Sequence, residues 1–149
     1  MENTSQKTSR TRISTIIIFV VTFAIAFFGT KYLFSGNAVD RQLKKTAIEM
    51  NKKCPVNVDN ETRLDSVASH EGAQIQYNYT LLNHVKEDTT IDYNAAKKYV
   101  LNNAQQNLDT NPQMEDFRKH DVAMKYRYND KNGKFLFDFT IKAKQEIKK

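Results

Sequence analysis

The side chains that could carry out nucleophilic catalysis are few in this sequence and lie far apart. Cys54 is the only cysteine, and the three histidines, His70, His84 and His120, all follow it. A thiol enzyme needs its cysteine beside a histidine that accepts the thiol proton, and sequence order does not show that proximity. No catalytic motif surrounds Cys54. The lack of a catalytic constellation favours a protein that is not an enzyme, and a small thiol-dependent enzyme using Cys54 is the alternative.

The residues that bind metals show no spacing typical of a metal site. The histidines have no paired spacing, and a single cysteine cannot form a cysteine cluster or an intramolecular disulfide. Glu87 and Asp88, like Glu115 and Asp116, are adjacent in the chain. Adjacent side chains of a helix or strand do not converge on one ligand. The sequence therefore predicts no metal and no cofactor.

A polar surface on predicted strands is the best candidate for recognition. Arg63 and Asp65 are two residues apart on a predicted strand, so both side chains project from the same face. We predict a binding face formed by Arg63, Asp65, Gln76, Asn78, Lys125 and Arg127, with Gln74 and Asp138 on the same surface. The alternative is an ordinary solvated face whose cross-strand ion pairs each contribute roughly a few tenths of a kcal/mol.

The charge distribution suggests a second candidate surface. The chain has a formal net charge of +6 at pH 7, and residues 119–149 are its most basic segment. A basic hairpin in this segment could bind an acidic partner or an anionic membrane surface. The alternative is a solvated strand edge followed by a basic tail. No recognised nucleic-acid-binding motif is present in the sequence, so we expect no nucleic acid among the partners.

Alternating side chains predict two β-hairpins. Ile75, Tyr77 and Tyr79 alternate with polar residues, which is typical of a strand with one buried face. The predicted strands are residues 62–69, 73–82, 122–128 and 135–142. We predict that the aromatic residues of these strands, Phe135 included, lie on the core face of the sheet.

Apolar residues at helical spacing predict helices before and between the hairpins. A first helix covers residues 39–53 and ends where Pro55 follows Cys54. Asp92 caps a second helix that runs to about residue 108, and a short third helix begins at Asn111 and Pro112. The predicted fold class is α+β, with an antiparallel four-stranded sheet covered by helices in two layers and the order α-β-β-α-α-β-β. An N-terminal transmembrane helix precedes this domain.

The N-terminal region carries a run of apolar residues long enough to cross a membrane. Residues 13–30 are uncharged, and the predicted anchor extends to residue 34. Lys7, Arg10 and Arg12 precede it, which favours a cytoplasmic tail over residues 1–12. The domain of residues 39–149 is then predicted to lie outside the cytoplasm. Basic residues after the run, among them Lys31 and Arg41, favour the opposite orientation.

A cleavable signal peptide is the alternative to an anchor. Gly36, Asn37 and Ala38 offer small residues where a signal peptidase could cleave, and cleavage near Ala38 would release a secreted soluble domain. The apolar run exceeds the roughly 7 to 15 residues of a typical signal peptide, and Lys31 interrupts its end. These features favour the uncleaved anchor.

Four segments together carry a family resemblance. They are NKKCPVNVDNETRLDSV at 51–67, QYNYTLLN at 76–83, TNPQMEDFRKH at 110–120 and YRYNDKNGKFLFDFTI at 126–141. In this order they resemble an uncharacterised family of small bacterial envelope proteins, either membrane-anchored or lipoproteins. No cysteine follows the apolar run closely enough to be lipidated, so the chain departs from the lipoprotein pattern. The resemblance implies a bacterial origin and no reaction.

These observations define the function that we expect. The chain is predicted to be a non-enzymatic domain, held by a single span in the bacterial inner membrane, that binds a protein or another envelope component. The polar face or the basic hairpin would form the binding surface.

Overall fold

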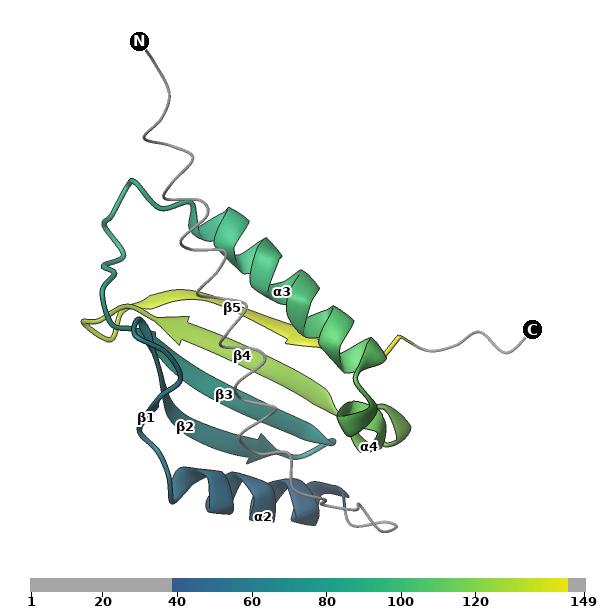
Figure 1. The fold of residues 1–149 in the computed structure, drawn as a ribbon. Coiled ribbons are helices and arrows are strands. Elements are labelled where there is room, and N and C mark those ends of the chain that lie inside the picture. The colour runs from purple at the N-terminus through teal and green to yellow at the C-terminus, as the bar shows by residue number, and fades with distance from the viewer. Residues whose placement is uncertain (1–38, 145–149) are drawn as a thin grey trace.

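Residues 39–144 are described by the computed structural model and form one layer of strands and one layer of helices (Figure 1). The five strands are β1 (Val56–Asn57), β2 (Thr62–His70), β3 (Gln74–Leu81), β4 (Ala123–Asn129) and β5 (Phe135–Ile141). The helices are α2 (Val39–Asn51), α3 (Tyr93–Thr110), the 3-10 turn η1 (Pro112–Met114) and α4 (Glu115–Lys119). The strands follow the order β1-β2-β3-β4-β5 in the sheet.

The prediction of a four-stranded antiparallel sheet was wrong. The sheet has five strands and is mixed, because β3 and β4 pair in parallel at its centre. Helix α3 lies between these two strands in sequence and forms the crossover that parallel pairing requires. The fifth strand is β1, which pairs with β2 through only Val56 and Asn57. The two predicted hairpins, β2–β3 and β4–β5, are antiparallel.

Helix α2 packs along β2 and β3 through one apolar stripe. Leu43, Ala47 and Met50 are buried at helical spacing. At the start of the helix the Asp40 carboxylate accepts hydrogen bonds from the N–H groups of Gly72 (3.2 Å) and Ala73 (2.7 Å). Both of those residues have positive φ in the β2–β3 turn. Asp40 therefore fixes the first turn of α2 to this hairpin.

Helix α3 is capped as the sequence predicts and packs on β5. The Asp92 side chain accepts hydrogen bonds from Asn94 N and Ala95 N. The buried residues of the helix are Ala96, Val100, Ala104 and Leu108. After its C-terminus, Arg118 Nη1 donates to the carbonyls of Leu108 (2.8 Å) and Asn111 (2.7 Å). Arg118 thus joins α4 to the end of α3, where the last carbonyls of a helix lack partners within the helix.

The core between the layers contains two rows of stacked aromatic rings. Tyr126 stacks between Tyr77 and Phe139, with centroid distances of 5.4 and 5.0 Å. A second row joins Tyr79, Tyr128 and Phe137 with distances of 5.1 and 4.8 Å. All of these residues are buried. The predicted core role of the strand aromatics is confirmed for them.

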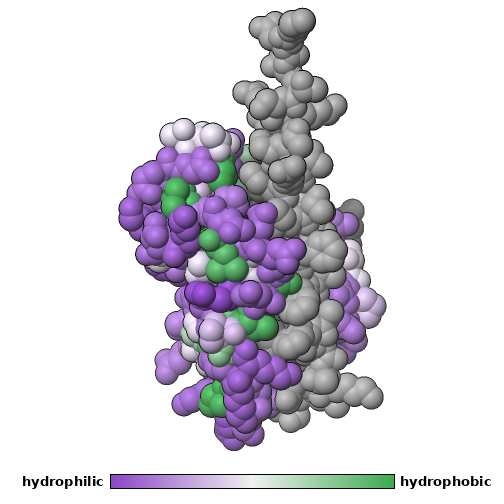
Figure 2. Space-filling model, turned by 60° about the vertical axis from the view of Figure 1, so that its left-hand side comes forward, coloured by the Kyte–Doolittle hydropathy of each residue, from purple (hydrophilic) through white to green (hydrophobic). Residues whose placement is uncertain are grey.

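The predicted cytoplasmic tail (1–12), membrane anchor (13–34) and cleavage site near Ala38 lie outside the described residues. Within residues 39–144, no helix has both the length and the apolar character needed to span a bilayer. The surface seen in Figure 2 is mostly hydrophilic, and its apolar patches are small and separate.

Candidate functional site

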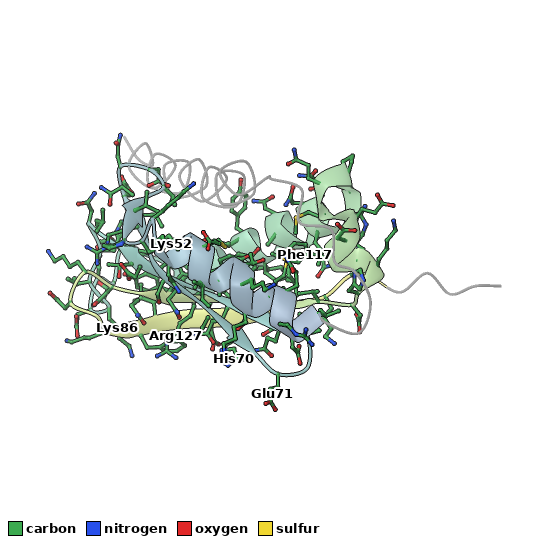
Figure 3. All side chains as sticks on the ribbon, turned by 90° about the horizontal axis from the view of Figure 1, so that it is seen from below. Lys52, His70, Glu71, Lys86, Phe117 and Arg127 are labelled. Carbon is green, nitrogen blue, oxygen red and sulfur yellow. The ribbon has the colours of Figure 1, made fainter. Side chains whose placement is uncertain are left out.

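The candidate site is the face of the sheet that points away from the helices. Helices α2 and α3 cover the strand residues that belong to the aromatic core. The residues at the alternate strand positions form the other face of the sheet, which we call the open face. Figure 3 shows Arg127 on the side of the sheet away from the helices. No described helix packs against the open face (Figure 1).

One end of the open face is organised by Asp65. Its Oδ1 atom lies 2.5 Å from Arg63 Nε, and its Oδ2 atom accepts a hydrogen bond of 2.5 Å from the Thr80 hydroxyl. The register of β2 and β3 shifts between Leu64 and Ser66, which gives Asp65 the extra position of a bulge. Both oxygens of this carboxylate are therefore engaged within the protein.

The centre of the open face is an amide and hydroxyl chain. Gln76 Nε2 donates to Asn78 Oδ1 at 2.7 Å, and Asn78 Nδ2 donates to the Ser66 hydroxyl at 3.0 Å. In the parallel register Asn78 lies beside Arg127, and Gln76 lies beside Lys125. The parallel pairing of β3 and β4 thus brings the polar residues of both hairpins together.

The remaining cations of the open face are on β4. Lys125 Nζ lies 3.4 Å from Asp138 Oδ2 on β5. The Arg127 guanidinium lies over the Phe135 ring, 4.9 Å from its centroid, and has no ion pair within residues 39–144. This stacking places Phe135 on the open face, where it is 39% exposed.

The predicted binding residues therefore lie on neighbouring strands of one surface: Arg63, Asp65, Gln76, Asn78, Lys125 and Arg127. Their role in binding stays a prediction. Sequence reasoning missed Thr80 and Ser66, and it placed Phe135 in the core, which was wrong. The register shifts between Tyr128 and Asn129, so Asn129 pairs with Phe135 and Leu136 is the extra residue of β5. Because of this extra residue, Phe135 and Phe137 lie on opposite faces of the sheet, although simple alternation predicts the same face for both.

The basic hairpin is largely neutralised by acids from other elements. Lys142 lies 3.4 Å from Asp121, and Lys144 lies 3.6 Å from Asp109. Lys134 pairs with Glu87 across the adjacent loop. Because of these pairs, the hairpin is a weaker candidate for binding an acidic partner than the composition of residues 119–149 predicts.

The two edge strands of the sheet differ in what pairs with them. On the β2 edge the Asn51 side chain donates to Val67 O (2.7 Å) and accepts from Val67 N (2.8 Å), so it occupies the place of a pairing strand. Strand β1 covers another part of that edge. Within residues 39–144, β5 has no strand beyond it. An unpaired edge can accept an extended segment.

Cys54 has the environment of a core residue. It is half-buried, packs against the hydrophobic core and precedes a cis Pro55. Burial, with the charge of Asp65, raises the pKa of its thiol. A catalytic cysteine needs a lowered pKa, because the thiolate is the nucleophile. This environment does not favour the thiol-enzyme alternative.

The histidines occupy separate places in the fold. His84 Nε2 lies 3.4 Å from Glu61, His120 Nδ1 lies 2.8 Å from the Asp116 carbonyl, and His70 ends β2. Residues 39–144 contain no group of three or more His, Cys, Asp or Glu side chains placed to hold a metal ion.

A buried carboxylate ties two loops together at one end of the sheet. Asp130 is fully buried, and its Oδ2 atom accepts from Lys86 N at 2.9 Å. Its Oδ1 atom accepts from Asn132 N and Lys134 N, both at 2.8 Å. These backbone donors leave the carboxylate no free role in catalysis or ligand binding, so Asp130 is a structural residue.

Two solved structures have a similar fold. The pilotin EpsS from the Vibrio vulnificus type 2 secretion system is 10% identical with a TM-score of 0.53, and the alignment covers 72% of this chain and 94% of that chain. The type II secretion system pilotin AspS from Vibrio cholerae is 11% identical with a TM-score of 0.50, and the alignment covers 69% of this chain and 87% of that chain. At these identities the likeness shows the fold alone.

The sequence itself matches one family. No curated protein matches this chain. Residues 37–137 match the model of a family described as a domain of unknown function, DUF8479. Because that match extends over more than half of the sequence, the chain belongs to the DUF8479 family.

Proposed function

We propose that this chain is a non-enzymatic envelope protein that binds a protein partner through its open face. One observation carries the proposal: a hydrogen-bonded polar surface spans four strands and no described helix covers it. Hydrogen bonds within this surface, such as Gln76 to Asn78 to Ser66, hold its side chains in fixed positions. A surface ordered before binding loses less conformational entropy when a partner docks.

The fold comparison supports a role in the envelope. Two proteins with a similar fold are named as pilotins of type II secretion systems. A secretion system is an assembly of proteins, so these neighbours support a protein partner. We propose that this chain also binds a protein partner in the envelope, and we do not identify that partner.

The location of the domain rests on the sequence. The basic residues before the apolar run of residues 13–34 support a tether whose C-terminal domain lies outside the cytoplasm. Both the tether and its orientation stay predictions.

Cross-linking from the open face tests the proposed function. A photo-reactive residue is placed at Gln76, in the centre of this face, and in a matched variant at Lys98, which is exposed on α3. The full chain is expressed in bacterial cells. We expect a discrete adduct from position 76 and none from position 98. Equal adducts from both positions, or no adduct from position 76, would contradict the proposal.

A further inference from the structure

We propose that Arg127, stacked on Phe135, binds a carboxylate of an acidic, extended segment of the partner protein. This inference rests on the proposed function and specifies the chemistry of the partner. It depends on the charge of the open face, on the contact between Arg127 and Phe135, and on the neighbouring strand edge.

The charge balance of the open face leaves one cation available. Arg63 is paired with Asp65, and Lys125 is paired with Asp138. Asp65 also accepts from Thr80, so its second oxygen is occupied. Arg127 lies across from Asp138 in the register, yet among residues 39–144 it has no ion pair. The face therefore complements a partner that supplies a negative charge at Arg127.

The stacking geometry prepares Arg127 for a carboxylate. The guanidinium lies 4.9 Å from the centroid of the Phe135 ring, which limits the positions of an otherwise flexible side chain. A guanidinium held over a ring still has N–H groups that can donate two parallel hydrogen bonds to a carboxylate. Phe135 is one of two large apolar side chains exposed within residues 39–144. Arginine beside an aromatic ring is typical of the energetic centre of an interface.

The neighbouring edge suggests the form of the partner segment. Phe135 begins β5, and β5 has no strand beyond it in the described part of the chain. A segment that adds to this edge in an extended conformation would pass beside Phe135, and the Arg127 guanidinium, which reaches from β4, lies over that ring. Main-chain hydrogen bonds would supply affinity, and the carboxylate would supply specificity.

Binding of defined peptides to the full chain in a neutral detergent tests this inference. The probe is a fluorescent octapeptide of alternating glutamate and threonine, and its counterpart carries glutamine in place of glutamate. We expect the glutamate peptide to bind about tenfold more tightly than the glutamine peptide, because charge-assisted hydrogen bonds are the stronger kind. Arg127→Gln should weaken binding of the glutamate peptide about tenfold, and Phe135→Ala should weaken it by a smaller factor.

The matched control is Lys119→Gln on α4, which removes the charge of a cation that is already paired, 2.8 Å from Glu115, and that lies outside the open face. We expect Lys119→Gln to change affinity less than about threefold. Thermal unfolding of each variant checks that its fold is intact.

Several outcomes would overturn the inference. The first is no binding of the glutamate peptide at millimolar concentration, and the second is equal binding of the glutamine peptide. The third is an equal loss in Lys119→Gln and Arg127→Gln, and the fourth is inorganic phosphate displacing the peptide better than acetate does. The cross-link from position 76 separates this inference from the proposed function. An adduct that persists unchanged in Arg127→Gln would keep the proposed function and reject the role of Arg127.

Discussion

The same strands carry two faces with opposite properties. On β3 the buried residues Ile75, Tyr77 and Tyr79 belong to the core. The side chains of Gln76 and Asn78 between them form hydrogen bonds with each other and with Ser66 on the open face. The covered face removes apolar area from water, which is the main source of stability. The open face contains ion pairs that solvent screens. Stability and the proposed recognition are therefore separated on the two sides of one sheet.

This separation has a consequence for evolution and for engineering. Substitutions on the open face change charge and hydrogen bonding with little loss of packing, so the proposed binding surface can vary while the fold is retained. Substitutions on the covered face affect every element that packs there. Variants at neighbouring positions of one strand can test this difference directly.

The largest expected effect is on the covered face of β2. Leu64 is fully buried, and Leu64→Ala should lower the free energy of unfolding by about 2 to 5 kcal/mol through lost burial and a cavity. The adjacent Arg63 is on the open face, and Arg63→Ala should cost less than about 1 kcal/mol. Thermal and denaturant unfolding of the two full-length variants give both values. Similar losses in both would mean that the open face contributes to stability as much as the core does.

The sequence was sufficient for the parts of the fold that depend on local spacing. The buried stripes of α2 and α3, the Asp92 cap and the two hairpins follow from side-chain periodicity and capping chemistry. The parallel pairing of β3 with β4 could not be predicted, because alternation is the same in parallel and antiparallel strands. The two residues of β1 are too few to show a pattern.

The candidate site was predictable in composition and not in arrangement. Alternation was sufficient to assign Gln76, Asn78, Lys125 and Arg127 to polar faces of their own hairpins. Only the parallel register places Asn78 beside Arg127. The position of Phe135 depends on the register shift after Tyr128, which no sequence signal marked.

A smaller effect is expected from the charge of Asp130, a buried carboxylate that does not belong to the open face. Burial raises the pKa of this carboxyl, but hydrogen bonds from the N–H groups of Lys86, Lys134 and Asn132 outweigh it, so the pKa lies below its usual value. Asp130→Asn replaces one accepting oxygen with an N–H₂ donor. We expect Tm at neutral pH to fall by several degrees.

The pH dependence of this loss follows from the sign of the pKa shift. A carboxyl whose pKa is lower in the folded state stabilises the protein above its unfolded pKa, about 3.9, and the contribution disappears as pH falls through the folded-state pKa. Native protein and Asp130→Asn should therefore converge in Tm in acid. Glu71→Gln, at the exposed residue in the β2–β3 turn (Figure 3), is the control and should leave Tm unchanged. A difference that stays constant down to low pH would show that the ionised carboxylate is not the stabilising form.

The smallest expected effect is that of removing the side-chain hydroxyl of Tyr128. Its hydroxyl is buried in the covered face and has no hydrogen-bond partner within the described part of the chain. Because a buried hydroxyl without a partner destabilises the folded state, Tyr128→Phe should leave the free energy of unfolding unchanged or raise it by up to about 1 kcal/mol. Tyr93→Phe is the matched control, since Tyr93 donates to Val85 O at 2.8 Å and should lose about 1 kcal/mol. Equal losses in both variants would mean that a bound water satisfies the Tyr128 hydroxyl, and that the covered face holds polar contacts as the open face does.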